Sequence, residues 1–246
     1  EAGADCVKFQ TFKAERVVTS NAPKANYQLE TTDALETQID MLRQLELPMD
    51  NYRELIELCE ELNIIFMSTP YNVEDVDFLE EIGVQSFKLA SLSIAEPTFL
   101  QYVALKNKPM IISTGMSFEQ EIIETINLVK HLGAPYVLLN CNSTYPAPFK
   151  DLNIKYLDRL KEIGNCMVGY SGHERGFNIV LAAVACGSKV VEKHFTLDKN
   201  MEGNDHKISL LPEEFKAMVE GIRQIEEAKG TESERILGPG ERMNRE

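Results

Sequence analysis

Val168-Gly-Tyr-Ser-Gly-His173 and Val190-Val-Glu-Lys-His-Phe-Thr196 are the two stretches of this sequence that decide its fold. Each begins with apolar residues typical of a strand, and each turns polar towards its end and presents a histidine. In a barrel of parallel strands the active site is built at the carboxyl ends of the strands. Two imidazoles at the ends of neighbouring strands can share one metal ion. This pair of histidines is therefore the first candidate for a functional site.

Similar apolar, β-branched stretches recur along the whole chain, and amphipathic helical patterns separate most of them. This alternation predicts a wound βα repeat with a parallel sheet. The expected strands cover residues 6–12, 64–71, 86–91, 109–116, 136–145, 166–173 and 190–197. The expected helices cover residues 33–45, 51–62, 73–82, 118–132, 154–163, 177–186 and 212–230. Four helical patterns are followed by a glycine suited to a helix C-cap, at Gly83, Gly133, Gly164 and Gly187.

The length of 246 residues suits a single TIM (β/α)8 barrel, which typically takes about 250 residues. The pattern yields seven strands where a closed barrel has eight, and Glu1-Ala-Gly-Ala-Asp5 resembles the connection into a strand. We therefore expect an α/β fold, a TIM barrel over residues 1–236 that lacks its first βα unit.

Composition excludes several classes of function. A net charge of −14 disfavours nucleic acid as a partner, because phosphate backbones are bound by clustered lysines and arginines. No apolar run approaches the roughly 20 residues that span a bilayer, and the N-terminus does not resemble a secretion signal. The odd number of cysteines, five, indicates reduced, buried thiols. We expect a soluble, cytoplasmic protein with no membrane partner.

Polar side chains near the ends of several strands are the second sign of a site. Residues two apart in a strand face the same side, so such pairs would converge at the mouth of a barrel. Any one of them alone is more often structural, although burying two unpaired lysines favours an anionic ligand. Together they favour a binding site. The residues are Lys8, Gln10, Thr69, Lys88, Ser91, Ser143, Tyr145, Ser171, His173, Glu192 and His194.

The two histidines suit a divalent transition metal in an open site that water and substrate oxygens complete. Such an ion would act as a Lewis acid, and Mn²⁺ is the ion we expect, with Mg²⁺ and Co²⁺ as alternatives. Asp205, in the loop after the last strand, either reaches this mouth or is an ordinary turn aspartate. His206 and His131 are better explained as surface or packing residues.

At this level of detail the sequence resembles a known family, the sialic acid synthases, also called N-acetylneuraminate synthases, which include legionaminic acid synthases. The resemblance runs from the first residues to the last. It rests on ordered motifs: Val7-Lys-Phe-Gln10, Met67-Ser-Thr-Pro70, Phe87-Lys-Leu-Ala-Ser91, Ile112-Ser-Thr-Gly115, Tyr145-Pro-Ala-Pro148, Gly169-Tyr-Ser-Gly-His173, Glu192-Lys-His-Phe-Thr-Leu-Asp198 and Gly203-Asn-Asp-His206.

The resemblance implies a TIM barrel followed by a small antifreeze-like domain, with residues 237–246 as the start of the linker between them. It implies condensation of phosphoenolpyruvate with an N-acylated mannosamine-type sugar, with phosphate released by C–O cleavage. In that family the small domain lends an arginine to the partner's sugar site, so the resemblance also implies a domain-swapped homodimer.

The resemblance further implies a role for each candidate residue. His173 and His194 would bind the metal, and Glu192 would position groups or transfer protons. Gln10, Tyr145 and Asp205 would face the sugar, and the catalytic set would be Glu192, Lys8, Lys88 and Asp205. The residues that would hold the phosphate and carboxylate of phosphoenolpyruvate are Lys8, Thr69, Lys88, Ser91, Ser143 and Ser171.

The sequence departs from the family pattern at specific places. Ser93 stands where many members carry a glutamate, and Ser143 stands where some carry an asparagine. A further functional glutamate of the family lies on the first strand, which is not found here. We therefore expect this chain by itself to be inactive or weakened.

Two other functions stay open. One is a phosphoenolpyruvate-using aldolase of the heptulosonate or octulosonate type, which would take a phosphorylated acceptor. The lack of an evident second set of basic residues on the loops disfavours it. The other is a catalytically impaired barrel that binds a ligand or acts as a scaffold, and Ser93 is one reason to consider it.

Overall fold

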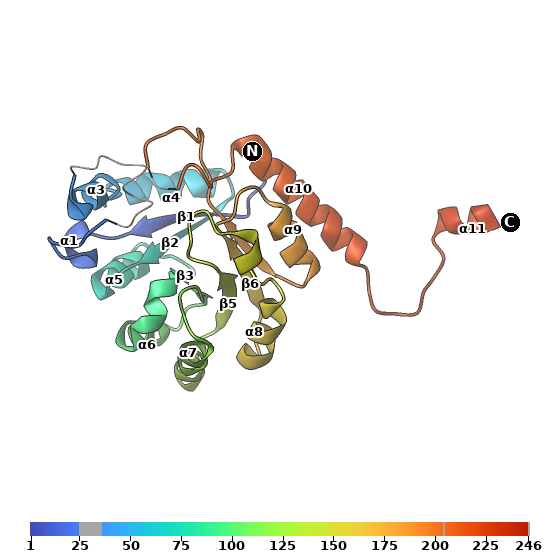
Figure 1. Ribbon diagram of the computed structural model, residues 1–246, viewed down its shortest axis with the longest axis horizontal. Coiled ribbons are helices and arrows are strands. Elements are labelled where there is room, and N and C mark those ends of the chain that lie inside the picture. Colours follow the sequence, from blue (N-terminus) through green and yellow to red (C-terminus); the bar gives the residue numbers. More distant parts are fainter. Residues whose placement is uncertain (25–35, 204, 246) are drawn as a thin grey trace.

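Seven parallel strands form the inner layer of the described part of the chain and follow one another in sequence order (Figure 1). The computed structural model describes residues 1–24, 36–203 and 205–245. The sheet curls with helices on its outside, so the prediction of an α/β fold of the TIM-barrel type is confirmed. One sheet pairs β1 (Cys6–Thr11) with β2 (Ile65–Pro70); the other contains β3 (Phe87–Leu89), β4 (Met110–Ser113), β5 (Tyr136–Cys141), β6 (Val168–Gly172) and β7 (Val190–Lys193).

Helices pack around this inner layer (Figure 1). The main ones are α4 (Asn51–Glu61), α5 (Val73–Glu81), α6 (Pro97–Leu105), α7 (Glu119–His131), α8 (Tyr156–Gly164), α9 (Asn178–Ala185) and α10 (Pro212–Lys229). Shorter helical pieces are α1 (Ala14–Val17), α3 (Gln38–Gln44), α11 (Pro239–Arg245) and the 3₁₀ turns η1 (Ser91–Ala95) and η2 (Phe149–Asp151).

The expected elements lie close to the observed ones, with two kinds of difference. Most strands end earlier than expected, for example at Cys141 where the pattern extends to residue 145, because the polar residues that follow leave the ladder and form the mouth. Helix α6 was not predicted, since its sequence Pro-Thr-Phe-Leu-Gln-Tyr-Val-Ala-Leu is too uniformly apolar to show a helical period. The helix expected at 33–45 begins outside the described residues and is observed as α3.

Helix ends follow from local sequence. Asn72 caps α5 by accepting a hydrogen bond from the Asp75 backbone N–H at 3.0 Å, and the Asp75 carboxylate accepts from the Asn72 N–H at 3.2 Å. Gly83 follows α5 with a φ of +85°, as a C-cap requires. Gly164 is not a cap, contrary to prediction, because it is the last residue of α8 and Asn165 takes the left-handed conformation.

The core of the protein lies between the strands and the helices. Residues of β3 and β4 alternate, so that Phe87, Leu89, Met110 and Ile112 are fully buried in this apolar layer. Lys88 lies between Phe87 and Leu89 and therefore points to the other face, into the barrel. The alternation separates an apolar outer layer from a barrel interior that carries polar groups.

A membrane span needs a long, continuously apolar helix, and none of the helices in the described residues meets both requirements. All five cysteines are free thiols, but only Cys59 is buried, and Cys186 is exposed. The prediction of buried thiols was wrong for Cys186, which follows the last turn of α9 on the outside of the barrel, and the other three thiols are half-buried.

Candidate functional site

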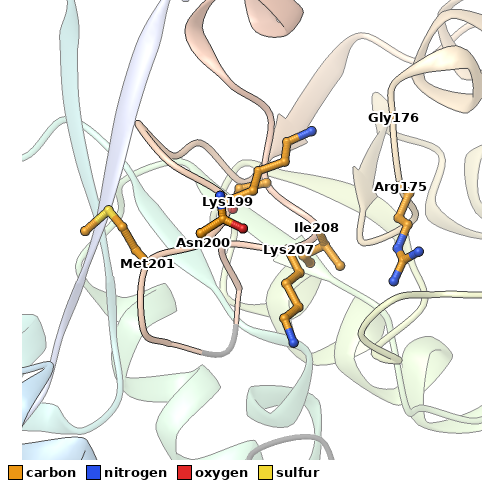
Figure 2. A pocket seen from close by; sticks show the side chains of 8 residues that line it. Arg175, Gly176, Lys199, Asn200, Met201, Lys207 and Ile208 are labelled. Atoms are coloured by element: carbon orange, nitrogen blue, oxygen red, sulfur yellow. The ribbon is translucent and has the colours of Figure 1, made fainter. Parts of the chain in front are cut away.

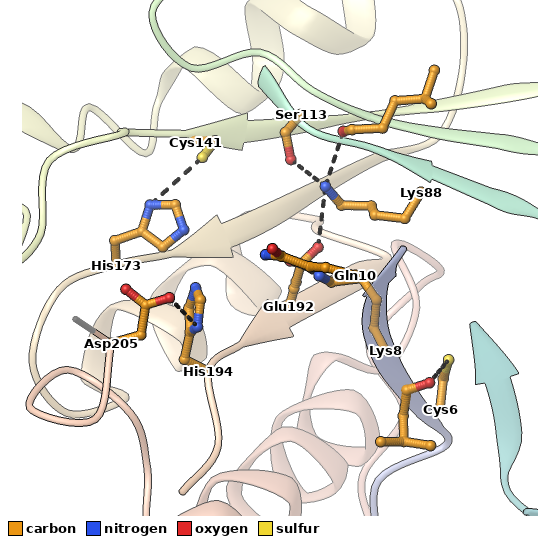
Figure 3. Close-up of polar contacts among 12 residues, drawn as sticks. Cys6, Lys8, Gln10, Lys88, Ser113, Cys141, His173, Glu192, His194 and Asp205 are labelled. Atoms are coloured by element: carbon orange, nitrogen blue, oxygen red, sulfur yellow. Dashed lines mark hydrogen bonds and ion pairs between the residues drawn. The ribbon is translucent and has the colours of Figure 1, made fainter. Parts of the chain in front are cut away.

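The register of the last three strands places three polar side chains side by side inside the barrel. Cys141 pairs with Ser171, and Ser171 pairs with Glu192. Residues paired in a parallel ladder point to the same face, so these side chains form a row across β5, β6 and β7. The row meets the side chains of β1 and β3 at one mouth (Figure 3).

Glu192 is the centre of a charged cluster in this mouth. Its carboxylate lies 3.5 Å from the Nζ of Lys8 on β1 and 3.3 Å from the Nζ of Lys88 on β3. Lys88 Nζ also donates to Ser113 Oγ at 2.7 Å and to the Leu89 carbonyl at 3.0 Å (Figure 3). Two ammonium groups surround one carboxylate, so the cluster as a whole attracts an anion.

The environment also sets the charge of the cluster members. Burial raises the pKa of Glu192, but Lys88 and Lys8 outweigh burial and hold that pKa at about 2. Burial lowers the pKa of Lys88, and the nearby Glu192 carboxylate opposes that shift. Glu192 is therefore ionised at neutral pH and is a fixed partner for the two lysines.

The two predicted metal ligands lie next to each other beyond the ends of β6 and β7. The ring centroids of His173 and His194 are 5.3 Å apart. His173 Nδ1 donates to the Asn142 carbonyl at 2.6 Å, and His194 Nδ1 lies 3.4 Å from the Asp205 carboxylate. Each histidine thus has a partner on Nδ1, so Nε2 is the atom that would face a metal ion, although in His173 it contacts the Tyr145 hydroxyl. Tyr145 stacks on His173 with ring centroids 4.2 Å apart, and its hydroxyl lies 3.1 Å from His173 Nε2.

The protonation state of the histidines suits metal binding. Burial lowers the pKa of both His173 and His194 to about 4, so both rings are neutral at physiological pH. Burial raises the pKa of the Asp205 carboxyl. The described residues contain no group of three or more histidines, cysteines or carboxylates arranged to hold a metal ion. A metal ion held by these two histidines alone would keep positions open for water or substrate.

The other predicted site residues lie around the same mouth. Gln10 is exposed and accepts a hydrogen bond from the Tyr71 hydroxyl at 3.2 Å. Thr69 is buried and pairs with Gln10 in the β1–β2 register. Ser91 Oγ accepts from the Gly115 N–H at 3.0 Å, and a Cβ at Gly115 would lie 2.8 Å from that oxygen and even closer to Ser143 Oγ. Ser91 and Ser143 therefore approach each other over a backbone that only glycine allows.

Several site residues were not predicted. Ser113 and Gly115 are two apart at the end of β4, which is the same spacing that marks the other strand ends, so the pattern was sufficient to find them. Cys141 lies in the row beside Ser171, with its Sγ 3.8 Å from His173 Nδ1. Asn142 acts through its backbone carbonyl, for which side-chain chemistry gives no signal.

Ser93, the position at which the sequence departs from the family pattern, is buried in η1, where its carbonyl accepts a hydrogen bond from the Glu96 N–H.

A pocket of about 490 Å³ lies on the loops that follow β6 and β7 (Figure 2). Three basic residues from separate parts of the chain, Arg175, Lys199 and Lys207, line it. Lys199 pairs with Glu214 at 2.6 Å, whereas Arg175 and Lys207 form no ion pair with the described residues. The expectation that the loops lack a second set of basic residues was therefore wrong. These residues are too far apart in the sequence to show as a cluster.

Comparison with known proteins finds several that are similar to this chain. A sequence model of the NeuB family matches residues 1–234. The N,N'-diacetyllegionaminic acid synthase of Campylobacter jejuni is 47% identical over 94% of this chain and 70% of its own length. The human N-acetylneuraminate-9-phosphate synthase is 36% identical over 96% of this chain and 66% of its own.

A solved structure is similar to this chain in both fold and sequence. The N-acetylneuraminic acid synthetase of Leptospira borgpetersenii, crystallised with citrate, superposes with a TM-score of 0.87 at 29% identity. The alignment covers 99% of this chain and 81% of that one.

Proposed function

Because this chain belongs to the NeuB family, we propose that it is a nonulosonate synthase that condenses phosphoenolpyruvate with an N-acylated mannosamine-type sugar. The observation that carries the proposal is the Lys8–Glu192–Lys88 cluster beside the histidine pair. The cluster suits an anionic substrate, and the neutral histidines suit a metal that faces a second substrate. Relatives named legionaminic acid and N-acetylneuraminate-9-phosphate synthases support this class of reaction.

Phosphoenolpyruvate would bind where the lysines converge. Lys8 and Lys88 would neutralise its phosphate and carboxylate, and hydroxyls from Thr69, Ser91 and Ser171 would donate hydrogen bonds to the same oxygens. Ser143 would add a further donor from the loop after β5. In the described structure Glu192 already occupies both lysines, so the substrate would share them with this carboxylate.

The histidine pair would hold a divalent ion, with Mn²⁺ as the first choice. The residues fit such an ion because both rings are neutral and both have Nδ1 occupied; the Tyr145 hydroxyl would have to give up its contact with His173 Nε2. When bound, the ion would polarise the aldehyde of the open-chain sugar. Gln10, Tyr145 and Asp205 would orient the sugar from the rim of the mouth.

The proposed reaction forms one C–C bond and breaks one C–O bond. C3 of phosphoenolpyruvate attacks the aldehyde carbon, and the developing charge at C2 is met by water. The resulting tetrahedral intermediate expels phosphate, with the bridging oxygen leaving with phosphorus. Glu192 would transfer protons in this sequence once the substrate anion has drawn Lys8 and Lys88 away, because in the described structure these lysines hold its pKa at about 2.

A phosphate-release assay on the complete gene product tests the proposal, because this chain by itself is expected to be inactive or weakened. Phosphate is expected only when phosphoenolpyruvate, an N-acyl hexosamine and Mn²⁺ are all present. The acceptor panel contains N-acetylmannosamine and its diamino, deoxy and 6-phosphate analogues. Release from phosphoenolpyruvate alone, or none with any sugar, would contradict it. Tight binding of phosphoenolpyruvate and Mn²⁺ without turnover would instead support a ligand-binding barrel.

The basic pocket favours a second candidate, a synthase whose acceptor carries a phosphate. Arg175 is two residues after His173 and Lys207 is two residues after Asp205, and neither forms an ion pair with a described carboxylate. In the same panel, a preference of at least tenfold in kcat/KM for the 6-phosphate analogue would support this candidate. An Arg175→Ala variant should then lose the preference while it retains activity on the unphosphorylated sugar.

A further inference from the structure

The strand pairing stops just before the two histidines. The last paired residues of β6 and β7 are Gly172 and Lys193, so His173 and His194 lie one residue beyond the ladder. The His173 carbonyl accepts from the Ala147 N–H at 3.1 Å, and the His194 carbonyl accepts from the Leu210 N–H at 2.8 Å. These bonds attach each histidine to a different loop. They do not fix the distance between the two histidines.

A buried ion pair on the opposite face of the sheet links the two strand ends. Glu174 follows His173, and Lys193 precedes His194. The Lys193 Nζ lies 3.2 Å from Glu174 Oε1, and both side chains are 0% exposed. Lys193 also donates to the backbone carbonyl of Glu174, and the Tyr170 hydroxyl donates to Glu174 Oε2 at 2.8 Å. This group, the Tyr170–Glu174–Lys193 cluster, therefore ties the backbone after one histidine to the residue before the other.

Close packing leaves this cluster little freedom. A Cβ at Gly172 would lie 2.7 Å from Glu174 Oε2 and 2.8 Å from the Tyr170 ring, so only glycine fits at the last position of β6. Tyr170 is 1% exposed and fills the space between β6 and the helices. The glutamate is therefore held from three sides, by a ring, an ammonium group and the sheet.

Stability alone does not explain such a pair. Removing two charges from water is costly, and a buried ion pair can often be replaced by apolar residues of similar volume without loss of stability. What an apolar replacement could not supply is the hydrogen bond from Lys193 to the Glu174 carbonyl, which the ion pair with the same residue accompanies. That link acts where the ladder has already ended.

We propose that the Tyr170–Glu174–Lys193 cluster is a positioning device that sets the spacing of His173 and His194 and thereby the affinity of the pair for a divalent ion. The inference rests on the metal-binding part of the proposed function. None of the three residues reaches the barrel interior, because Tyr170 and Lys193 alternate with Ser171 and Glu192. The cluster acts on the ions and substrates only through the backbone of the histidines.

The test compares the affinity for Mn²⁺ with the affinity for phosphoenolpyruvate. The main variant is Glu174→Gln with Lys193→Met, which removes both charges and retains volume. The Kd of Mn²⁺ is measured from the electron paramagnetic resonance signal of the free ion, and that of phosphoenolpyruvate by calorimetry without metal. We expect the Kd of Mn²⁺ to rise about 10- to 100-fold, as for other residues that orient metal ligands. The Kd of phosphoenolpyruvate should change less than twofold, because Lys8 and Lys88 are on other strands.

Two further variants make the result interpretable. Tyr170→Phe removes one hydrogen bond from Glu174 and leaves the ion pair, so it should weaken Mn²⁺ binding by a smaller factor, about threefold. It also keeps the proposal testable should the double variant fail to fold. Val103→Ala is the stability control. It creates a cavity at the buried face of α6 and should leave the Kd of Mn²⁺ unchanged.

Three results from the variants overturn the proposal. The first is a wild-type Kd of Mn²⁺ in the double variant or in a folded Tyr170→Phe protein. The others are an equal loss of affinity for Mn²⁺ and for phosphoenolpyruvate in the double variant, and a loss of Mn²⁺ affinity in Val103→Ala as large as that in the double variant. Failure of the wild-type protein to bind Mn²⁺ also overturns it. If Mn²⁺ binding responds as expected but no sugar is converted, the proposed reaction fails and the positioning role stands.

Discussion

Glu192 lies between the proposed anion site and the proposed metal site. Its carboxylate holds Lys8 and Lys88 in the described structure, and the same strand leads to His194 two residues later. An incoming anionic substrate must take over part of the lysine contacts that Glu192 now makes. The residue therefore competes with the substrate in the ground state while it is placed to assist later proton transfers.

This competition gives a specific prediction for Glu192→Gln. The variant keeps the shape of the side chain but no longer neutralises the lysines, so KM for phosphoenolpyruvate should stay the same or fall. Loss of a proton-transfer group should lower kcat about 10²- to 10⁴-fold. Lys88→Met is the matched control, because it should raise that KM. A rise in KM with unchanged kcat in Glu192→Gln would contradict the assignment.

The histidine pair gives a prediction that does not depend on turnover. His173→Ala and His194→Ala should each abolish measurable Mn²⁺ binding, since two ligands are the most that the described protein supplies. His131→Ala is the control, because His131 is exposed at the end of α7. Electron paramagnetic resonance of added Mn²⁺ distinguishes the variants. Equal Mn²⁺ affinity in His173→Ala and the wild type would exclude this site.

At the scale of single elements, helix α5 is capped by a carboxyl group that burial holds in an unusual state. Asp75 is fully buried and accepts from the N–H groups of Tyr71 and Asn72, both at 3.2 Å. Burial nevertheless dominates these hydrogen bonds and raises the pKa of Asp75 to about 6. The folded protein therefore binds a proton here more tightly than the unfolded chain does.

The raised pKa of Asp75 predicts how stability changes with pH. Its contribution to the free energy of unfolding is fully present below about pH 4 and is lost as pH rises through about 6. In Asp75→Asn that dependence disappears. From pH 4 to 7 the wild type should therefore lose about 2 to 3 kcal/mol relative to the variant. Urea unfolding at several pH values measures this difference, and parallel pH profiles for both proteins would contradict it.

The sequence predicted most elements because their patterns are local. The alternation that separates Lys88 from Phe87 and Leu89 is visible in three consecutive residues, and polar pairs such as Ser171 and His173 mark a strand end directly. Helix α6 was missed because its residues are apolar on every side. The basic pocket was missed because Arg175 and Lys207 meet only after two loops have folded. The Tyr170–Glu174–Lys193 cluster was missed because its members face away from the mouth, where the pattern gave no reason to expect charge.

At the scale of the whole molecule, α10 packs beside α9 and reaches the chain segment before β1. Val219 on α10 lies against Gly3, and Arg223 pairs with Asp5 at 2.9 Å. Both side chains of this ion pair are at least half exposed, whereas Met218 is only 2% exposed. The apolar contact should therefore hold the helix in place.

Two substitutions on α10 test this view. Met218→Ala should lower the free energy of unfolding by about 2 to 5 kcal/mol through a cavity in the core. Arg223→Ala should lower it by less than about 1 kcal/mol, because water screens the exposed pair. Denaturant titration of both variants under one set of conditions gives the comparison. A larger effect from Arg223→Ala would show that the ion pair, and not packing, secures α10.

The candidate site draws on residues from Lys8 to Asp205, and the Lys8–Glu192 ion pair joins the first described strand to the last. During synthesis on the ribosome, Lys8 therefore emerges long before its partner has been translated. Until that point the nascent chain carries a lysine without its counter-charge and an incomplete binding mouth. Neither substrate nor metal can assist folding before the last βα unit has left the exit tunnel.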